Sequence, residues 1–130
     1  MDYSKEEIIN KIAAAFRFVG ENSDFRKRAG DNTLTILFEI EDMDVRNLVT
    51  IDDGSIFWGS DIPENSDLRV RWKHWEHLTS WTASWMPLWW YRLLRRVHVE
   101  GEQSPVLQEC LYLFRNYLHL MMKEDRNGRM

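Results

Sequence analysis

The sequence lacks the features that would place it in an oxidising compartment, on nucleic acid or across a membrane. Its 130 residues include one cysteine, so no disulfide can form within the chain. The net charge is −4, whereas a nucleic-acid-binding protein usually presents a basic face. No apolar run approaches the roughly 20 residues that span a bilayer, and the polar start Met1 to Glu7 is unlike a signal peptide. We therefore expect a cytoplasmic protein without a nucleic-acid partner.

The common arrangements of catalytic and metal-binding side chains are also missing from the sequence. No Gly-rich phosphate loop occurs, and the acidic residues from Glu39 to Asp53 lack the spacing of a calcium loop. His74 and His77 are spaced i, i+3 on a predicted helix, but a zinc site needs at least a third ligand. Cys110 lies on an apolar helix face, where burial makes a thiol unreactive. The sequence thus predicts no enzymatic activity, no metal and no cofactor.

What the chain does contain is tryptophan: seven residues, six of them between Trp72 and Trp90. Its length is that of one domain with a hydrophobic core, for which we expect residues 1–124, followed by a polar tail at 125–130. Buried aromatic side chains stabilise a core through the area they bury, whereas several exposed indoles would need a ligand or a partner to cover them. The cluster is consistent with core, with a ligand wall or with an interface.

Hydrophobic periodicity predicts helices at both ends and strands between them. Ser4 and Glu7 form a capping box before a helix that ends near Gly20, and Ser104 with Pro105 begins a helix that continues to Lys123. Residues 33–59 alternate as a three-stranded β-meander with a hairpin at Asp53-Gly54, and residues 67–101 read as strand, helices and strand. The predicted fold is α+β: a five-stranded, mostly antiparallel sheet with helices covering one face.

The final helix has an apolar face that is wider than one neighbour can cover. Its apolar side chains fall in an arc of about 200°, whereas covering a single surface needs little more than about 100°. The helix must therefore lie against two things. The first is expected to be the sheet, and the second is another helix, a partner or an apolar ligand.

Three stretches resemble the sterol carrier protein-2 family. Leu34 to Trp58 is similar to its opening β-meander, Asp67 to Arg71 to the strand before its middle helices, and Arg96 to Glu102 to the strand before its last helix. One departure is the indole-rich stretch Ser80 to Trp90, where the family often has a small turn containing glycine. The resemblance implies a lipid-binding fold with an apolar tunnel between sheet and helices. Members of this family bind fatty acids, fatty acyl-CoAs, sterols or related apolar molecules.

We expect the chain to bind or carry an apolar ligand, such as a lipid, sterol, fatty acid or acyl-CoA, between the sheet and the Trp-rich helices. The predicted ligand-binding residues are Trp81, Trp85, Met86, Trp89, Trp90, Leu93, Leu107, Cys110, Phe114, Tyr117, Leu118 and Met121. The alternative is an interaction module or accessory subunit, in which indoles fill the cavity and the same surface docks a partner enzyme or a second copy.

Arg92, Arg95 and Arg96 lie opposite the indoles in the short helix that follows Pro87. Guanidinium groups in such a position can attract a phosphate, either of a membrane surface or of a CoA thioester. A solvated charged face is the other interpretation, so transient membrane contact remains a hypothesis.

Overall fold

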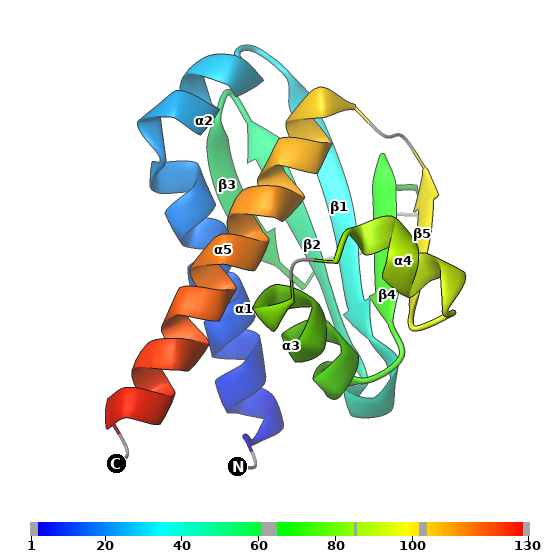
Figure 1. The fold of residues 1–130 in the computed structure, drawn as a ribbon. Coiled ribbons are helices and arrows are strands. Elements are labelled where there is room, and N and C mark those ends of the chain that lie inside the picture. The colour runs from blue at the N-terminus through cyan, green and yellow to red at the C-terminus, as the bar shows by residue number, and fades with distance from the viewer. Residues whose placement is uncertain (1–2, 61–64, 85, 102–103, 129–130) are drawn as a thin grey trace.

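The helices of the chain gather on one face of a single five-stranded sheet (Figure 1). The computed structural model describes residues 3–60, 65–84, 86–101 and 104–128, with side chains up to residue 125. The helices are α1 (Lys5–Glu21), α2 (Ser23–Ala29), the 3-10 turn η1 (Glu41–Met43), α3 (Trp75–Ala83), α4 (Leu88–Leu93) and α5 (Pro105–Gly128). The strands are β1 (Thr33–Ile40), β2 (Val45–Asp52), β3 (Ser55–Gly59), β4 (Leu68–Trp72) and β5 (Val97–Gly101).

The sheet has the order β3-β2-β1-β4-β5 and contains one parallel pair. The β1–β2, β2–β3 and β4–β5 pairs are antiparallel, whereas β1 and β4 run parallel. The parallel pair arises because the chain leaves the edge strand β3 and crosses to the free side of β1. The predicted α+β class and the mostly antiparallel five-stranded sheet are confirmed, with the sheet mixed at its centre.

Local capping interactions explain where three helices begin. Ser4 Oγ accepts a hydrogen bond from the backbone N–H of Glu7, and the Glu7 carboxylate accepts one from the N–H of Ser4, as the capping box predicts. At α5 the Ser104 hydroxyl accepts from the N–H of Leu107 at 3.2 Å. Asn22 caps α2 through the N–H of Phe25 at 2.9 Å. The sequence pattern did not predict α2, because seven mainly polar residues show little periodicity.

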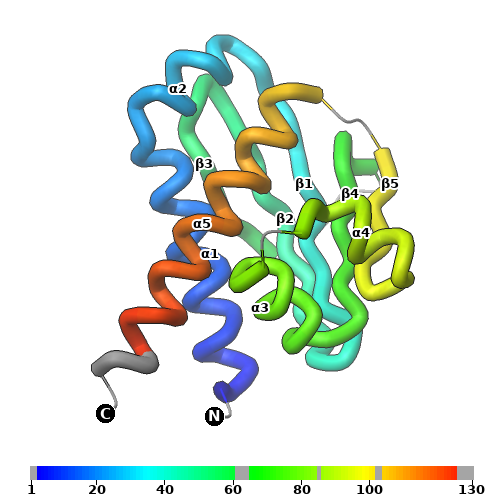
Figure 2. Tube along the Cα trace, in the orientation of Figure 1, coloured from blue at the N-terminus to red at the C-terminus, as the bar shows by residue number. Residues whose placement is uncertain are grey.

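Helices α1 and α5 lie side by side across the sheet (Figure 2). Their aromatic side chains form the centre of the core. The Phe114 ring stacks on Phe16 with centroids 4.1 Å apart and meets Phe38 of β1 edge-on at 5.3 Å. A second aromatic group joins Trp72 of β4 to Trp81 of α3 and to Tyr91 of α4, with centroids 5.4 and 6.1 Å apart. These contacts seal the sheet beneath α1, α3 and α4.

Strand β1 is buried on both faces from Ile36 to Ile40, rather than half-buried as its alternation predicted. On the face away from the helices, Glu39 is flanked by Arg69 and by Arg46, the latter at 3.4 Å. Long arginine side chains cover the carboxylate and the neighbouring Leu37, because their aliphatic stems pack along the sheet while their charged ends stay hydrated. The outer face of β4, which carries Arg69 and Arg71, is therefore partly neutralised.

Among the residues that the structure describes, no helix combines the length and apolar character needed to cross a bilayer.

Candidate functional site

The wide apolar arc of α5 is closed mainly by the chain's own helices and sheet. Cys110, Phe114 and Leu118 are fully buried in the main core. On one flank α1 contributes Phe16, and on the other α3 lies against the helix. Near its N-terminal end, however, α5 extends beyond α3, and there Leu107 and Leu111 line a cavity. Besides the sheet, α5 thus packs against helices α1, α2 and α3, and a hollow adjoins it near its N-terminal end.

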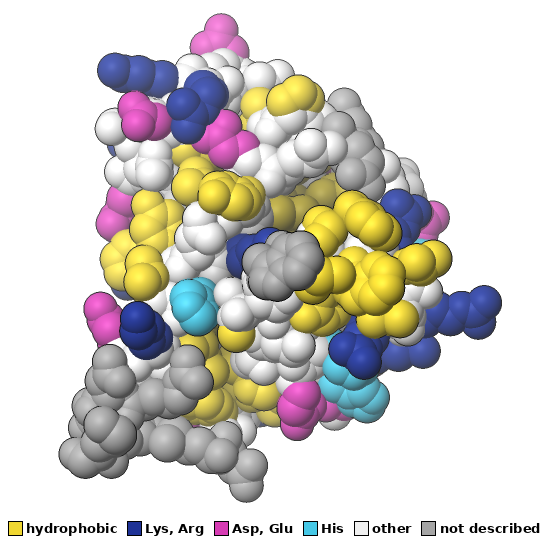
Figure 3. Space-filling model, in the orientation of Figure 1, with side chains coloured by type: hydrophobic (Ala, Val, Ile, Leu, Met, Phe, Trp, Pro, Cys, Tyr) yellow, Lys and Arg dark blue, Asp and Glu magenta, His cyan; other side chains and the backbone are white. Residues whose placement is uncertain are grey.

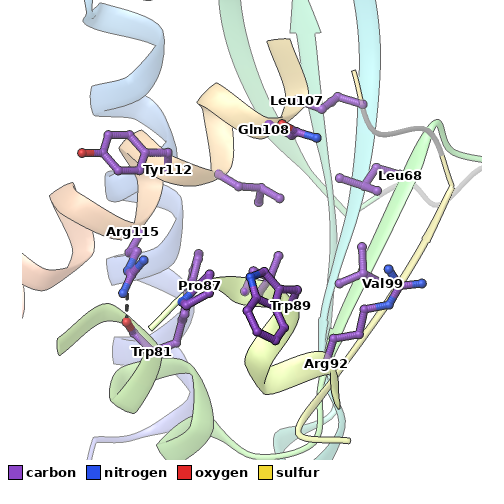
Figure 4. A pocket seen from close by; sticks show the side chains of 12 residues that line it. Leu68, Trp81, Pro87, Trp89, Arg92, Val99, Leu107, Gln108, Tyr112 and Arg115 are labelled. Atoms are coloured by element: carbon purple, nitrogen blue, oxygen red, sulfur yellow. Dashed lines mark hydrogen bonds between the residues drawn. The ribbon is translucent and has the colours of Figure 1, made fainter. Parts of the chain in front are cut away.

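This cavity has a volume of about 360 Å³ and lies between α5, α4 and the β4–β5 edge of the sheet (Figure 4). Its floor is aliphatic and buried, formed by Leu68 of β4, Val99 of β5 and Leu107 of α5. Its side walls are formed by Trp81 of α3, by Pro87, Leu88 and Trp89 at the start of α4, and by Leu111 and Tyr112 of α5. The cavity is open to solvent between Trp89 and Tyr112, both of which are exposed.

Arg115 holds α5 to the C-terminal end of α3 at one side of the cavity. Its Nε donates to the carbonyl oxygen of Trp81 at 3.0 Å, and its terminal nitrogen donates to the carbonyl oxygen of Ser84. The guanidinium also lies over the Trp81 ring, 5.1 Å from the centroid. Burial lowers the pKa of Arg115, although a guanidinium stays protonated at neutral pH. This cation adds a donor to two carbonyl groups at the end of the helix, of which that of Trp81 also accepts from the N–H of Ser84 at 3.2 Å.

The remaining polar side chains lie at the rim of the cavity. Arg92 of α4 is exposed beside Trp89 and Val99, and Gln108 is exposed on the α5 side (Figure 4). The indole N–H of Trp81 is buried and has no hydrogen-bond partner among the described residues. An apolar floor below a polar rim is the usual composition of a small-molecule pocket.

The predicted ligand-binding residues separate into four groups in the structure. Trp81, Trp89 and Leu107 line the cavity. Cys110, Phe114 and Leu118 are in the core instead, and burial raises the pKa of the Cys110 thiol, as its position on the apolar face suggested. Met86, Trp90, Tyr117 and Met121 are half-buried and pack against the core, Leu93 is exposed, and Trp85 lies outside the described residues.

Several residues that line the cavity were not predicted from the sequence: Leu68, Pro87, Leu88, Arg92, Val99, Gln108, Leu111, Tyr112 and Arg115. Leu68 and Val99 carry an inward strand pattern, but nothing local distinguishes a position beneath a helix from one beneath a hollow. Arg92 was placed on the face opposite the indoles. Tyr91 is the buried residue of α4, so the helix is rotated relative to the orientation that the sequence pattern predicted. Arg92 therefore lies beside Trp89.

A second hollow of about 650 Å³ lies between Tyr3, α3 and the C-terminal half of α5. It is larger but more polar, because Asp42, Glu76 and His119 contribute to its walls. Beside it, ligand atoms of Asp42, His74 and Glu76 lie within 4.8 Å of one another, all on exposed side chains. The His74 and His77 rings, spaced i, i+3 as noted above, meet edge-on at 4.9 Å. Exposed charged groups of this kind are usually solvated, so the smaller apolar cavity is the better candidate site.

No protein-family model matches the sequence, and no curated protein matches it either. Solved structures do match the fold. UbiJ-SCP2, a ubiquinone synthesis protein, aligns with a TM-score of 0.59 at 12% identity and covers 89% of this chain and 96% of its own. A crystal structure of sterol carrier protein 2 gives a TM-score of 0.55 at 10% identity, covering 82% of this chain and 95% of its own.

A third similar structure is the sec-alkylsulfatase Pisa1 from Pseudomonas sp., with a TM-score of 0.56 at 18% identity over 68% of this chain. The chain spans 14% of the length of that sulfatase. The alignments with UbiJ-SCP2 and sterol carrier protein 2 cover most of the chain in both directions. The chain therefore has the sterol carrier protein-2 fold, as the motifs in its sequence predicted.

Proposed function

We propose that the chain binds an apolar molecule in the cavity between α4, α5 and the β4–β5 edge, and carries it without chemical change. The observation that supports this most strongly is the floor of Leu68, Val99 and Leu107, three buried aliphatic side chains beneath an opening to solvent. An apolar ligand would remove that surface from water, with a gain of roughly 25 cal/mol per Å² before ordering costs.

The size of the cavity limits what it can enclose. A volume of about 360 Å³ lies near the lower end of the range of roughly 300–1,000 Å³ for ligand pockets. It therefore suits a medium-length alkyl or acyl chain, or one small ring system, better than a whole sterol. A longer ligand would extend out between Trp89 and Tyr112.

The fold supports the same class of ligand. Two proteins that share it over most of their length are named for sterol carriage and for ubiquinone synthesis. A non-catalytic role is supported by the lining, because the Tyr112 phenol has no carboxylate, imidazole, thiol or serine hydroxyl to act with among the described residues around the cavity. Acid–base and nucleophilic catalysis both depend on such groups.

A pair of tryptophan substitutions on α5 tests the proposal. In Leu111→Trp the new indole would occupy the cavity, whereas in Leu120→Trp it would lie on the exposed side of the same helix. Binding of fluorescent medium-chain fatty acids should weaken at least tenfold in the first variant and stay unchanged in the second. Native mass spectrometry of freshly purified protein should detect a co-purified apolar molecule in the wild type and less of it in Leu111→Trp.

Thermal unfolding of both variants controls for misfolding. The proposal is wrong if the wild type neither co-purifies with an apolar molecule nor binds the probes. It is also wrong if the two folded variants bind the probes equally well, because the ligand would then lie elsewhere.

A further inference from the structure

Helix α4 presents large apolar side chains to water at the mouth of the cavity. Trp89 is 62% exposed, Leu93 65% and the C-cap residue Leu94 44%, and across the opening Tyr112 is 60% exposed. These are four of the seven exposed large hydrophobic side chains among the described residues. Figure 3 shows hydrophobic side chains gathered over α4 around a hollow. A grouped apolar surface with a polar border usually marks a site of contact.

A basic groove adjoins this apolar surface. It has a volume of about 390 Å³, and its charged lining comprises Arg71, Lys73, Arg92, Arg95 and Glu41, with His98 beside them. Glu41 is already paired with Arg71 at 3.1 Å. Four cations therefore meet one carboxylate on a chain whose net charge is −4. Because Arg92 lines both this groove and the apolar cavity, the two regions are continuous.

The turn that ends α4 places one of these cations at a backbone position that normally favours glycine. The N–H of Arg96 donates to the carbonyl of Tyr91 and the N–H of Arg95 to that of Arg92, both at 3.0 Å, which closes the helix with a Schellman motif. Arg95 occupies the left-handed position of that motif, with φ +60°. Glycine would adopt this conformation without strain, so Arg95 occupies this position at a conformational cost.

We propose that α4 and its C-terminal turn dock on an anionic phospholipid bilayer. Trp89, Leu93 and Leu94 enter the interfacial region, while Lys73, Arg92 and Arg95 contact lipid phosphates. Apolar insertion combined with basic attraction is how short amphipathic segments bind membrane surfaces reversibly. Docked in this way, the cavity opens toward the bilayer, where an apolar ligand would enter and leave. That last step rests on the proposed function, whereas docking itself does not.

Charge favours a bilayer over a second copy of the chain. In a two-fold dimer each surface faces its own equivalent, so the basic grooves would lie close to one another. Like charges brought together across an interface oppose association, whereas anionic headgroups complement the groove. The apolar side chains alone would suit either occupant, and the adjacent cations select the bilayer.

Co-sedimentation of the full chain with vesicles tests the proposal. We expect binding to phosphatidylcholine vesicles that contain phosphatidylglycerol, weaker binding to phosphatidylcholine alone, and a decrease as salt is added. The double variant Leu93→Ser, Leu94→Ser should bind at least tenfold more weakly. Its matched control is Phe57→Ser, Leu120→Ser, which removes side chains of similar exposure (58% and 53%) elsewhere on the surface and should bind like the wild type.

The contributions of the basic side chains and of the Trp89 indole to docking can be measured separately. Arg92→Gln and Arg95→Gln should each reduce binding to anionic vesicles about fivefold, the change expected for one basic residue close to such a surface, with little effect on neutral vesicles. Brominated lipids should quench the tryptophan fluorescence of the wild type, and they should quench that of Trp89→Phe to a smaller extent. The control Trp58→Phe removes a half-buried indole of β3, away from α4, and should keep the full quenching.

Docking is refuted if the wild type does not sediment with anionic vesicles, or if the Leu93 and Leu94 variant sediments like its control. It is also refuted if the chain forms a dimer in solution that this variant abolishes. Ligand binding measured without vesicles is a separate result: if it fails while docking persists, only the proposed function is lost. If docking fails while ligand binding persists, only the membrane proposal is lost.

Discussion

Phe114 provides the sharpest test of which part of the α5 arc is core and which part is ligand site. Its ring is fully buried, stacked on Phe16 at 4.1 Å and edge-on to Phe38 at 5.3 Å. Removing a buried phenylalanine costs about 3–5 kcal/mol, and each well-placed aromatic pair contributes about 0.5–1.5 kcal/mol beyond its area. Phe114→Ala should therefore lower the free energy of unfolding by about 4–5 kcal/mol, which is most of the stability of a marginal domain.

Because Phe114→Ala could unfold the protein, Phe114→Leu is the working variant, with an expected loss of about 1–2 kcal/mol. Urea unfolding followed by tryptophan fluorescence measures this loss. Tyr112→Ala, two residues away on the cavity side, should change stability by less than about 0.5 kcal/mol because its side chain is exposed.

Only one of the two variants should change the binding of an apolar probe. Tyr112→Ala should weaken binding of the probe, since it removes part of the cavity wall. Phe114→Leu should leave the affinity for the probe unchanged. If Phe114→Leu weakens binding of the probe while the free energy of unfolding hardly changes, the part of α5 around Phe114 faces a ligand and not the protein core. The division of the helix argued above would then be wrong.

Three further predictions concern the backbone at Gly101, the hydrogen bonds of Arg115 at the end of α3, and the thiol of Cys110. Gly101→Ala should lower stability by more than about 2 kcal/mol in thermal unfolding, because φ is +117° and the added Cβ would collide with the Asp67 carbonyl oxygen. Arg115→Met should cost about 1–3 kcal/mol in urea unfolding, since the Ser84 carbonyl loses its Arg115 donor and the Trp81 carbonyl keeps only the N–H of Ser84, and Arg115→Lys should recover only part of this. Burial raises the pKa of the Cys110 thiol, so this thiol stays protonated in the folded chain at a pH where it ionises in the unfolded chain. The free energy of unfolding should therefore fall above about pH 8.5 in the wild type, and this fall should be absent in Cys110→Ala. Thiol reagents should label Cys110 only as the chain unfolds.

The elements that the sequence predicted well are those whose signal is local. The capping residues Ser4, Glu7 and Ser104 act within one helical turn, and Asp53-Gly54 forms its hairpin through its own backbone. The alternation in residues 33–59 and the motifs near Asp67 and Arg96 were sufficient to predict the sheet and the sterol carrier protein-2 fold. The helix α2 lacked such a signal and was not predicted.

The position of the site depended on contacts between distant parts of the chain. Leu68, Val99 and Leu107 form one floor although a strand, two helices and their connections separate the first from the last. In α4 the sequence pattern placed Trp89, Trp90 and Tyr91 on one side, whereas packing against Trp72 buries Tyr91 and leaves Trp89 exposed. Tertiary packing thus set which indoles line the cavity and which face water.

The sequence by itself determined that α5 has an apolar arc needing more than one neighbour, and that the strands form one sheet beneath it. Only the tertiary structure decided what covers each part of that arc. Along most of the helix the sheet, α1 and α3 meet it, as the contact of Phe114 with Phe16 shows, while at Leu107 and Leu111 a cavity remains. The physical reason is that a hydrophobic pattern records which side chains avoid water, and burial against a protein or against a ligand satisfies that requirement equally.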